Sequence, residues 1–343
     1  MVSHRRSTQP GVNRSVRVTV LTAAAATAAA TLGAAAAHAD PKGTPRTARA
    51  EIDRLYSEAE HATEQYNKAG ENADRLRGEL NRDRDRAARG QERINRMRMA
   101  LGSAATAQYR SGAIDPSLAL LLSADPDSYL DRAATLDRLN ARQATVLHQL
   151  QRARRGLAQV RAEAARSLAG LERNRAAATR HNRTVEGKIR QARQLLASLP
   201  AADRAAFDRA SRSGRDAALP DPADLPAGSS RAAAAVMAVR QAVGRPYVWG
   251  ASGPTGFDCS GLMQWAYAQA GVSLPRTSQA QRYAGHMVPL SQARPGDLVA
   301  YRSDAGHIGM YVGDGQVIHA PHPGAPVRYD PVGMMPVSSV TRV

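Results

Sequence analysis

The chain contains one cysteine, Cys259, in the stretch Phe257-Asp258-Cys259-Ser260-Gly261-Leu262, directly before a helical pattern. Two histidines follow at positions typical of strands, His307 in Gly306-His307-Ile308-Gly309 and then His319. A lone thiol followed by histidines is the residue set of a cysteine nucleophile and its base. The sequence therefore predicts a catalytic triad of Cys259, His307 and His319.

The expected roles follow from the chemistry of these groups. A helix over residues 260–270, with Asp258 near its cap, would place the thiol in the field of the helix N-terminus. That field supplies only about 0.3–1 kcal/mol, so an imidazole must contact the thiol to ionise it. His307 would take the proton and later give it to the leaving amine, while His319 orients His307. The backbone N–H of Cys259, with the Tyr247 hydroxyl, would stabilise the oxyanion.

The two histidines can act together only if they share one face of a β-hairpin. With a two-residue loop in Gly313-Asp314-Gly315, His319 would oppose Met310 and the two rings would face opposite sides. With a three-residue loop, His319 opposes Gly309 and lies on the same face as His307. The catalytic interpretation therefore predicts an odd-length loop or a bulge.

Each of these residues also has a purely structural interpretation. A buried cysteine can serve as a small apolar side chain, and His319 can be a satisfied core histidine, with His322 as a rival for the third position. Tyr247 can be an ordinary core aromatic. A zinc site needs more ligands than one cysteine and scattered histidines provide, so no metal or cofactor is expected.

The last third of the chain resembles the NlpC-type cell-wall cysteine peptidases, which have a papain-like fold. The matching stretches are Arg245-Pro246-Tyr247-Val248-Trp249-Gly250, Asp258-Cys259-Ser260-Gly261-Leu262, Leu274-Pro275-Arg276-Thr277-Ser278, Arg294-Pro295-Gly296-Asp297-Leu298, Gly306-His307-Ile308-Gly309-Met310-Tyr311 and Val317-Ile318-His319-Ala320. They cover nearly all of residues 231–343 in the order of the family. The match departs at Ala251, where the family pattern often has a second glycine.

The resemblance implies an α+β catalytic domain, with helices packed on an antiparallel sheet. It implies hydrolysis of peptidoglycan stem peptides between D-glutamate and diaminopimelate or lysine. It also assigns Cys259, His307 and His319 as the triad. The resemblance also implies substrate contacts at Tyr247, Asp258, Ser260 and Arg276.

The N-terminal segment has the pattern of a secretory signal peptide over residues 1–39. Four arginines precede the uncharged, alanine-rich residues 18–37, and Ala37-His38-Ala39 is a small-x-small cleavage site before Asp40. The alternative is a transmembrane anchor, since the apolar run is about long enough to span a bilayer. We expect a secreted protein associated with the cell wall.

The charge of the chain indicates acidic partners. The formal net charge is +17; residues 231–343 carry nine arginines against five acids, and the rest carries 38 basic against 25 acidic residues. An exported protein rarely meets nucleic acid, so an anionic wall polymer is the better match. The other interpretation is a solvated helix surface with many ion pairs.

Residues 40–199 have the pattern of a long antiparallel coiled-coil hairpin. Apolar residues recur with three-four spacing from Ile52 to Leu101 and again from Leu136 to Leu199. Polar seam positions at Asn174, His181 and Lys188 predict looser packing in that part. Residues 111–129 form the expected turn.

The turn holds the run Leu118-Ala119-Leu120-Leu121-Leu122. This run would either cap the hairpin tip or dock a membrane complex. The composition shifts abruptly to Pro, Asp, Ser and Gly over residues 200–230, which are expected to be a linker to a peptidase domain at 231–343.

This layout is similar to cell-separation hydrolases in which the coiled coil blocks the site until a membrane transporter-like complex pulls it away. Autoinhibition is therefore expected here as well. Two other functions stay open. One is a non-catalytic activator that presents a degenerate domain to another hydrolase, and the other is a thiol amidase that cuts the glycan–peptide link.

Overall fold

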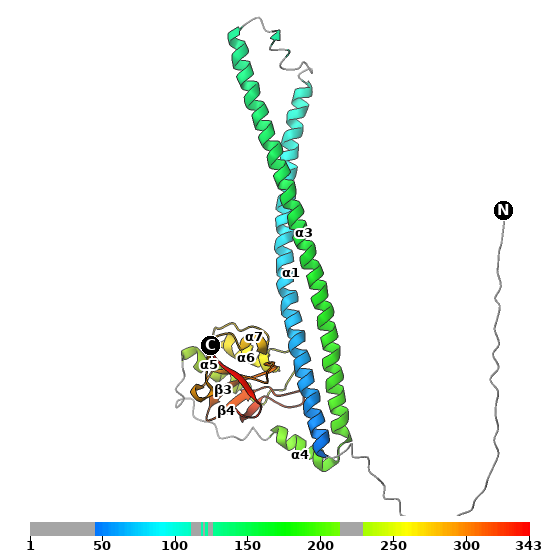
Figure 1. Cartoon of the computed structure of the whole chain (residues 1–343), viewed down its shortest axis with the longest axis vertical. Helices are drawn as coiled ribbons and strands as arrows, with labels where there is room; N and C mark the ends of the chain where they lie inside the picture. The colour runs from blue at the N-terminus through cyan, green and yellow to red at the C-terminus, as the bar shows by residue number, and fades with distance from the viewer. Residues whose placement is uncertain (1–44, 111–117, 119–120, 123–125, 213–228) are drawn as a thin grey trace, which may run out of the picture. The chain divides into compact units, whose positions relative to one another are not determined.

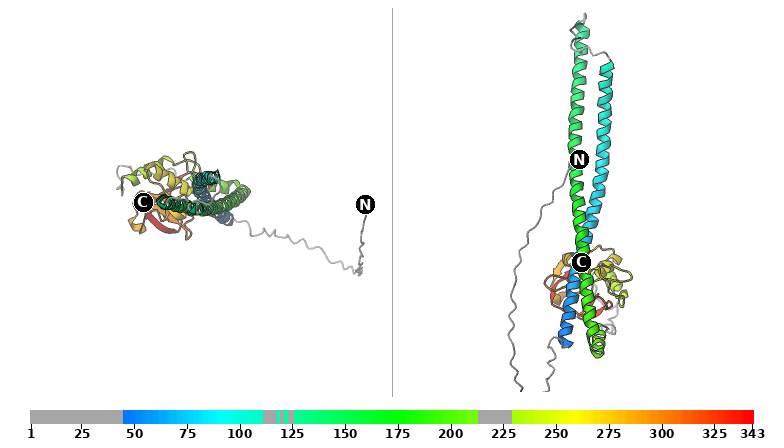
Figure 2. Two further views of the ribbon diagram at one scale, coloured as in Figure 1. Left: turned by 90° about the horizontal axis from the view of Figure 1, so that it is seen from above. Right: turned by 90° about the vertical axis from the view of Figure 1, so that its right-hand side faces the viewer.

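The computed structural model describes residues 45–110, 118, 121–122, 126–212 and 229–343. Two long helices, α1 (Pro45–Arg110) and α3 (Pro126–Ser198), form the predicted hairpin and lie side by side in both views of Figure 2. Within the described residues, no helix has an apolar stretch that could cross a membrane. The predicted signal peptide at 1–39 lies outside the described residues.

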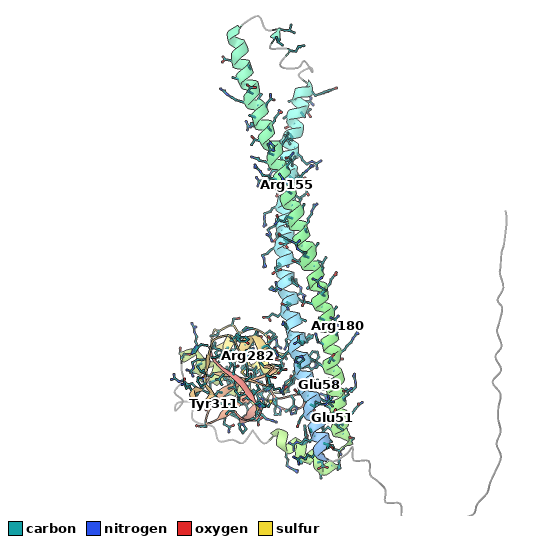
Figure 3. The ribbon with its side chains drawn as sticks, viewed as in Figure 1. Glu51, Glu58, Arg155, Arg180, Arg282 and Tyr311 are labelled. Atoms are coloured by element: carbon teal, nitrogen blue, oxygen red, sulfur yellow. The ribbon has the colours of Figure 1, made fainter. Side chains whose placement is uncertain are left out.

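The apolar seam of the hairpin follows the predicted three-four spacing. On α1, the buried positions Ile52, Leu55, Ala59 and Ala62 continue through Ala69, Ala73 and Leu80. They pack against Leu171, Val185, Ile189 and Ala192 of α3. Charged side chains occupy the outer positions, Arg155 and Arg180 of α3 among them, and point away from the seam (Figure 3). A long helix with this pattern buries one stripe and leaves the other faces to solvent.

The looser part of the hairpin is not where the polar seam residues predicted it. Val185 and Ala192, next to His181 and Lys188, are fully buried, whereas Leu139 and Leu147 nearer the tip are each 49% exposed. The cause is local: Ile189 and the nearby Trp249 supply apolar surface around the polar positions. Most of the predicted turn, 111–129, lies outside the described residues; Leu118, Leu121 and Leu122 are exposed.

The predicted linker needs a correction over its first third, because residues Ala201–Arg212 form a helix, α4. This stretch is rich in alanine and arginine, which favour helix, and Asp203 in its first turn complements the helix dipole. Its Phe207 is buried and packs against Ile52, Leu55 and Tyr56 of α1. The Pro- and Gly-rich remainder, 213–228, lies outside the described residues.

The C-terminal region is an α+β domain, which confirms the predicted fold class (Figure 1). Its helices are α5 (Ser230–Gln241), α6 (Cys259–Gln269) and α7 (Ser278–Gln281), with a short 3-10 turn, η4, at Leu290–Gln292. Its strands are β1 (His286–Val288), β2 (Leu298–Tyr301), β3 (His307–Gly313), β4 (Gln316–His319), β5 (Arg328–Pro331) and β6 (Val337–Arg342). They form one antiparallel sheet in the order β1-β6-β2-β3-β4-β5.

Helices α5 and α6 cover one face of this sheet and bury the larger core, which includes Val239, Leu262, Ile308 and Ile318. The other face carries a smaller cluster around Val299, Tyr301, Val317 and Val340. Strand β3 lies in the middle of the sheet and is buried along almost its whole length. Side chains that project from β3 and β4 are therefore held by packing on both sides.

The hairpin of β3 and β4 has the register that the catalytic interpretation requires. Met310 pairs with Ile318 and Tyr311 with Val317, which places His319 opposite Gly309 and on the same face as His307. A bulge after Tyr311 restores this register around a tight Asp314-Gly315 turn, where both residues have positive φ. Of the two predicted solutions, the bulge is the one that occurs.

Candidate active site

The thiol of Cys259 lies at the first residue of α6. Asp258 caps this helix, because its Oδ1 accepts a hydrogen bond of 2.6 Å from the backbone N–H of Gly261. The cap packs so closely that a Cβ at Gly261 would lie 2.2 Å from the carbonyl oxygen of Ala251. The Asp-Cys-Ser-Gly sequence therefore encodes a tight helix start, which holds the thiol in one place.

The two predicted histidines contact each other directly. His307 Nε2 lies 2.7 Å from His319 Nδ1, the rings are perpendicular, and both side chains are buried. The register explains this contact, because His307 is the diagonal neighbour of His319 across the β3–β4 ladder.

A carboxylate on the next strand continues the line of hydrogen bonds. His319 Nε2 lies 2.8 Å from Asp330 Oδ2, and the same oxygen accepts a 2.8 Å hydrogen bond from Arg328 Nε. Arg328 pairs with His319 across the β4–β5 ladder, so Asp330, two residues on, faces the same side.

Three of the four predicted substrate contacts form one network at the start of α6. Arg276 donates from Nη1 and Nη2 to both oxygens of Asp258, at 3.0 and 2.6 Å, and from Nη1 to Ser260 Oγ at 2.9 Å. Tyr247, the fourth, is buried in the same core cluster as Cys259. The structure thus brings the predicted residues together on adjoining elements.

Helix α1 places two carboxylates into this site. Glu64 Oε1 accepts a 2.7 Å hydrogen bond from Ser260 Oγ and is 3.7 Å from Cys259 Sγ, while Oε2 accepts one from the backbone N–H of Ser278 at 2.8 Å. Glu60 lies one helical turn earlier on α1, next to His307. Its Oε1 is 3.2 Å from His307 Nδ1, and its Oε2 accepts a 2.7 Å hydrogen bond from Arg302.

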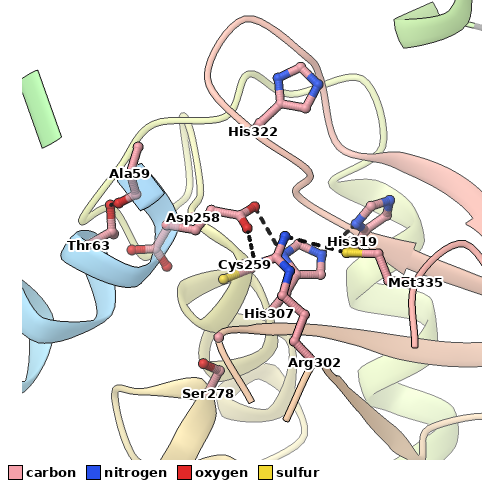
Figure 4. A network of polar contacts seen from close by, with 12 residues as sticks. Ala59, Thr63, Asp258, Cys259, Ser278, Arg302, His307, His319, His322 and Met335 are labelled. Atoms are coloured by element: carbon pink, nitrogen blue, oxygen red, sulfur yellow. Dashed lines mark hydrogen bonds and ion pairs between the residues drawn. The ribbon is translucent and has the colours of Figure 1, made fainter. Parts of the chain in front are cut away.

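Because residues four apart on a helix are neighbours on its surface, the thiol and the imidazole face adjacent turns of α1. Figure 4 shows Cys259, His307, His319 and Arg302 around the same network. The contact of His307 Nδ1 with Glu60 is short enough for an ion pair but is not aligned as a hydrogen bond. Cys259 and His307 are 1% and 0% exposed, so α1 closes the site to solvent.

Further contacts hold α1 at the rim of the site. Asn67 donates a 3.0 Å hydrogen bond to Asp258, and the ring of Tyr56 stacks on His322 at 4.4 Å. A cavity of about 540 Å³ remains beside these contacts, lined by Arg302, His319 and Asp330 together with residues of α1 and α4. The part of the cleft beyond the histidine pair is therefore still open.

Comparison with known proteins identifies the family of the C-terminal domain. Residues 244–340 match the model of the NlpC/P60 family. Residues 244–340 are an NlpC/P60 domain. It contains every predicted site residue as well as Asp330.

The curated relatives share this domain. The chain is 47% identical over 126 residues to a probable endopeptidase of Corynebacterium glutamicum (strain R), covering 35% of this chain and 60% of that protein. It is 49% identical over 106 residues to a probable endopeptidase of Mycobacterium tuberculosis (strain ATCC 25618 / H37Rv), covering 31% of this chain and 27% of that protein. The chain thus spans between about a quarter and three fifths of these relatives.

Among solved structures, the P60 domain of the Mycobacterium avium subspecies paratuberculosis antigen MAP1204 is 35% identical. The match covers 33% of this chain and 93% of that one, with a TM-score of 0.31. The NlpC/p60 domain of the peptidoglycan hydrolase SagA is 36% identical, with 33% and 98% coverage and the same TM-score.

The electrostatics of the NlpC/P60 domain in this arrangement disfavour a thiolate. Burial, reinforced by the carboxylates of Glu64, Asp258 and Glu60, raises the pKa of the Cys259 thiol well above its ordinary value. Burial also raises the pKa of Glu64, with the charge of Asp258 as the next cause, to about 7. For Glu60, burial works against ionisation, but His307 and Arg302 outweigh it and lower its pKa. The thiol is therefore held protonated beside the buried carboxyl groups of Glu64, Asp258 and Glu60.

The sequence patterns did not predict the α1 residues of the site or Asp330. The α1 residues did leave a pattern in the sequence, because they recur at helical spacing. They form a second buried stripe on α1 beside the apolar seam: Tyr56, Glu60, Thr63, Glu64 and Asn67. Because these side chains are mostly polar, the stripe was indistinguishable from a solvated helix face. In the described residues, no group of three or more His, Cys, Asp or Glu side chains could hold a metal ion.

Proposed function

We propose that this chain is an exported peptidoglycan hydrolase of the cysteine type, restrained by its own coiled coil. It would cleave stem peptides between D-glutamate and diaminopimelate or lysine. The observation that carries the proposal is the buried His307–His319 pair, which faces the same two turns of α1 as the thiol at the start of α6. The NlpC/P60 match and the names of the relatives support the same class of reaction.

The chemistry proceeds in two steps once α1 has left. The Cys259 thiol gives its proton to His307, and the sulfur attacks the peptide carbonyl, so that a C–S bond forms. The proton on His307 then goes to the leaving amine as the C–N bond breaks, which leaves a thioester. Water, deprotonated by His307, hydrolyses the thioester and restores the thiol. The backbone N–H of Cys259 and the Tyr247 hydroxyl are the proposed oxyanion donors.

The substrate would occupy the positions that α1 now fills. Ser260, Arg276 and Asp258 would bind polar groups of the stem peptide near the thiol, where Glu64 and Asn67 now make hydrogen bonds. Hydrolysis therefore requires α1 to withdraw, and that withdrawal also removes two carboxylates that disfavour the thiolate. The coiled coil would act as a plug rather than as a spacer.

Export and release complete the proposal. Residues 1–39 would direct secretion and be removed before Asp40, which places the mature chain at the cell wall. The exposed leucines Leu118, Leu121 and Leu122 at the hairpin tip offer an apolar site for a membrane complex that pulls the coiled coil. Neither part involves nucleic acid.

Digestion of purified peptidoglycan by residues 229–343, followed by mass spectrometry of the products, tests the reaction. We expect fragments cut within the stem peptide, and no cleavage by the same fragment with Cys259→Ala. Products separated at the glycan–peptide link would identify an amidase instead. A Cys259→Ala full chain that still supported complete wall digestion would identify a non-catalytic activator.

A further inference from the structure

Asp330 is the one carboxylate of the histidine network that lies on the NlpC/P60 domain itself. We propose that Asp330 is a positioning residue, which fixes the tautomers of both histidines and leaves His307 Nδ1 as the basic nitrogen of the site. This inference rests on the proposed cysteine hydrolase, because it assigns a residue to that reaction.

The argument starts at the buried end of the network. An ionised carboxylate can only accept hydrogen bonds, and Asp330 receives one from Arg328 Nε at 2.8 Å. Its other partner, His319 Nε2 at 2.8 Å, must therefore carry a proton. Although burial opposes ionisation of Asp330, the hydrogen bond from His319 and the charge of Arg328 favour the carboxylate, and the pKa of Asp330 is lowered.

The second step concerns His319. Burial lowers the pKa of His319 to about 4, against the opposing effect of Asp330, so the ring is neutral near pH 7. A neutral imidazole has one N–H and one lone pair. With the proton on Nε2, the lone pair is on Nδ1, which lies 2.7 Å from His307 Nε2. His307 must then donate from Nε2.

The third step concerns Nδ1 of His307, the ring nitrogen on the side of the proposed reaction. With Nε2 of His307 committed as a donor, the proton that the ring gains or loses is the one on Nδ1. That nitrogen faces Glu60, one turn from the glutamate that contacts Cys259. In the plugged site Nδ1 lies 3.2 Å from Glu60 Oε1, and after α1 withdraws its lone pair is free to accept the thiol proton. Without Asp330, His319 could hold its proton on Nδ1, and His307 would then present an N–H to the site instead of a lone pair.

The test uses the full chain with Glu60→Ala and Glu64→Ala, so that Nδ1 is not masked, and ¹⁵N-labelled histidine. Two-bond ¹⁵N–¹H NMR correlations report which ring nitrogen carries the proton. We expect Nε2–H on both His307 and His319. Asp330→Ala removes the acceptor of His319 Nε2–H, and we expect it to place the proton on Nδ1 of both rings. It should lower kcat on peptidoglycan by roughly 10³-fold, with little change in KM, as expected when a base is held in the wrong tautomer.

Tyr329→Phe is the matched control on the same strand, and we expect it to change neither the tautomers nor kcat. A purely structural role for Asp330 would lower thermal stability but leave the tautomers of the folded fraction unchanged, and that result would overturn the proposal. If Asp330→Ala does not fold, the parent chain decides, because Nδ1–H on His319 there contradicts the proposal. If the chain hydrolyses no peptidoglycan, the proposed function fails, while the NMR result still decides the role of Asp330.

Discussion

Helix α1 has two buried faces, and they differ in chemistry. The face towards α3 is apolar, with Ile52 and Ala59 almost fully buried, whereas the face towards the NlpC/P60 domain buries Glu60, Glu64 and Asn67. Apolar burial stabilises by about 1.5–3 kcal/mol for each large side chain. Buried ion pairs contribute little net stability, because the cost of desolvation offsets their attraction. Under the proposed function, the hairpin would be the permanent contact and the contact between α1 and the domain the releasable one.

The polar face also confers specificity, which an apolar face would not. Glu60 and Glu64 each have hydrogen-bond partners in the site, and each would be left as a buried carboxyl group without partners if these were missing. Such a contact forms only in one geometry, yet the polar groups of α1 and of the domain are readily solvated once they separate. That combination suits a plug that must fit closely and still leave.

The largest expected effect comes from the polar face. Glu60→Ala with Glu64→Ala removes the α1 side of both buried contacts. The contact of Glu60 with Arg302 is an ion pair, and breaking such a buried pair costs about 3–5 kcal/mol. The double substitution also removes two of the carboxyl groups that raise the pKa of the Cys259 thiol. We expect Cys259 in the full chain to be alkylated by iodoacetamide at least about 100-fold faster. An unchanged rate would show that these carboxylates do not hold the plug.

A change of pH should have the next largest effect. Glu64 in the plug keeps its proton up to about pH 7, whereas a solvated glutamate loses it near pH 4.3. The plugged state therefore binds more protons between these values, and its stability falls as pH rises from about 5 to 7, by roughly tenfold per pH unit at most. The groups that face Glu64 are Asp258, Cys259 and Arg276.

Hydrogen exchange of the Ser278 amide, which donates to Glu64, measures this opening. After correction for intrinsic exchange, protection should fall across pH 5–7 in the parent chain. It should stay level in Glu64→Gln, whose amide does not titrate. An equal pH dependence in both chains would assign the effect to another group.

The smallest effect on the plug should come from the apolar face. Leu80→Ala removes a buried seam residue that packs against Leu171, and we expect it to cost about 2–5 kcal/mol of hairpin stability. Circular dichroism should report a lower melting temperature, while Cys259 alkylation below that temperature stays unchanged. Faster alkylation would mean that the two faces of α1 are not independent.

Much of the fold followed from local patterns. The three-four spacing predicted both long helices. The two histidines predicted the β3–β4 register, with a bulge as one of the two ways to reach it. Cys259, His307 and His319 could be singled out because few other functions need those residue types together.

Two kinds of feature could not be predicted in this way. Strand β5 has only four residues and ends at Pro331, so no alternation marks it, and Asp330 on it gave no signal. The contact between α1 and the domain joins residues about 200 positions apart, and no local rule relates Glu64 to Ser260. From the sequence alone, the polar stripe of α1 is indistinguishable from a solvated helix surface.

The central claim is that α1 plugs a working cysteine hydrolase site, and peptidoglycan digestion tests it most directly. Three proteins should be compared at equal concentration on the same wall preparation: the full chain, its Glu60→Ala/Glu64→Ala variant, and residues 229–343. We predict that the full chain is slow and that the variant approaches the rate of the isolated domain. Equal rates for the unchanged full chain and the isolated domain would contradict the plug.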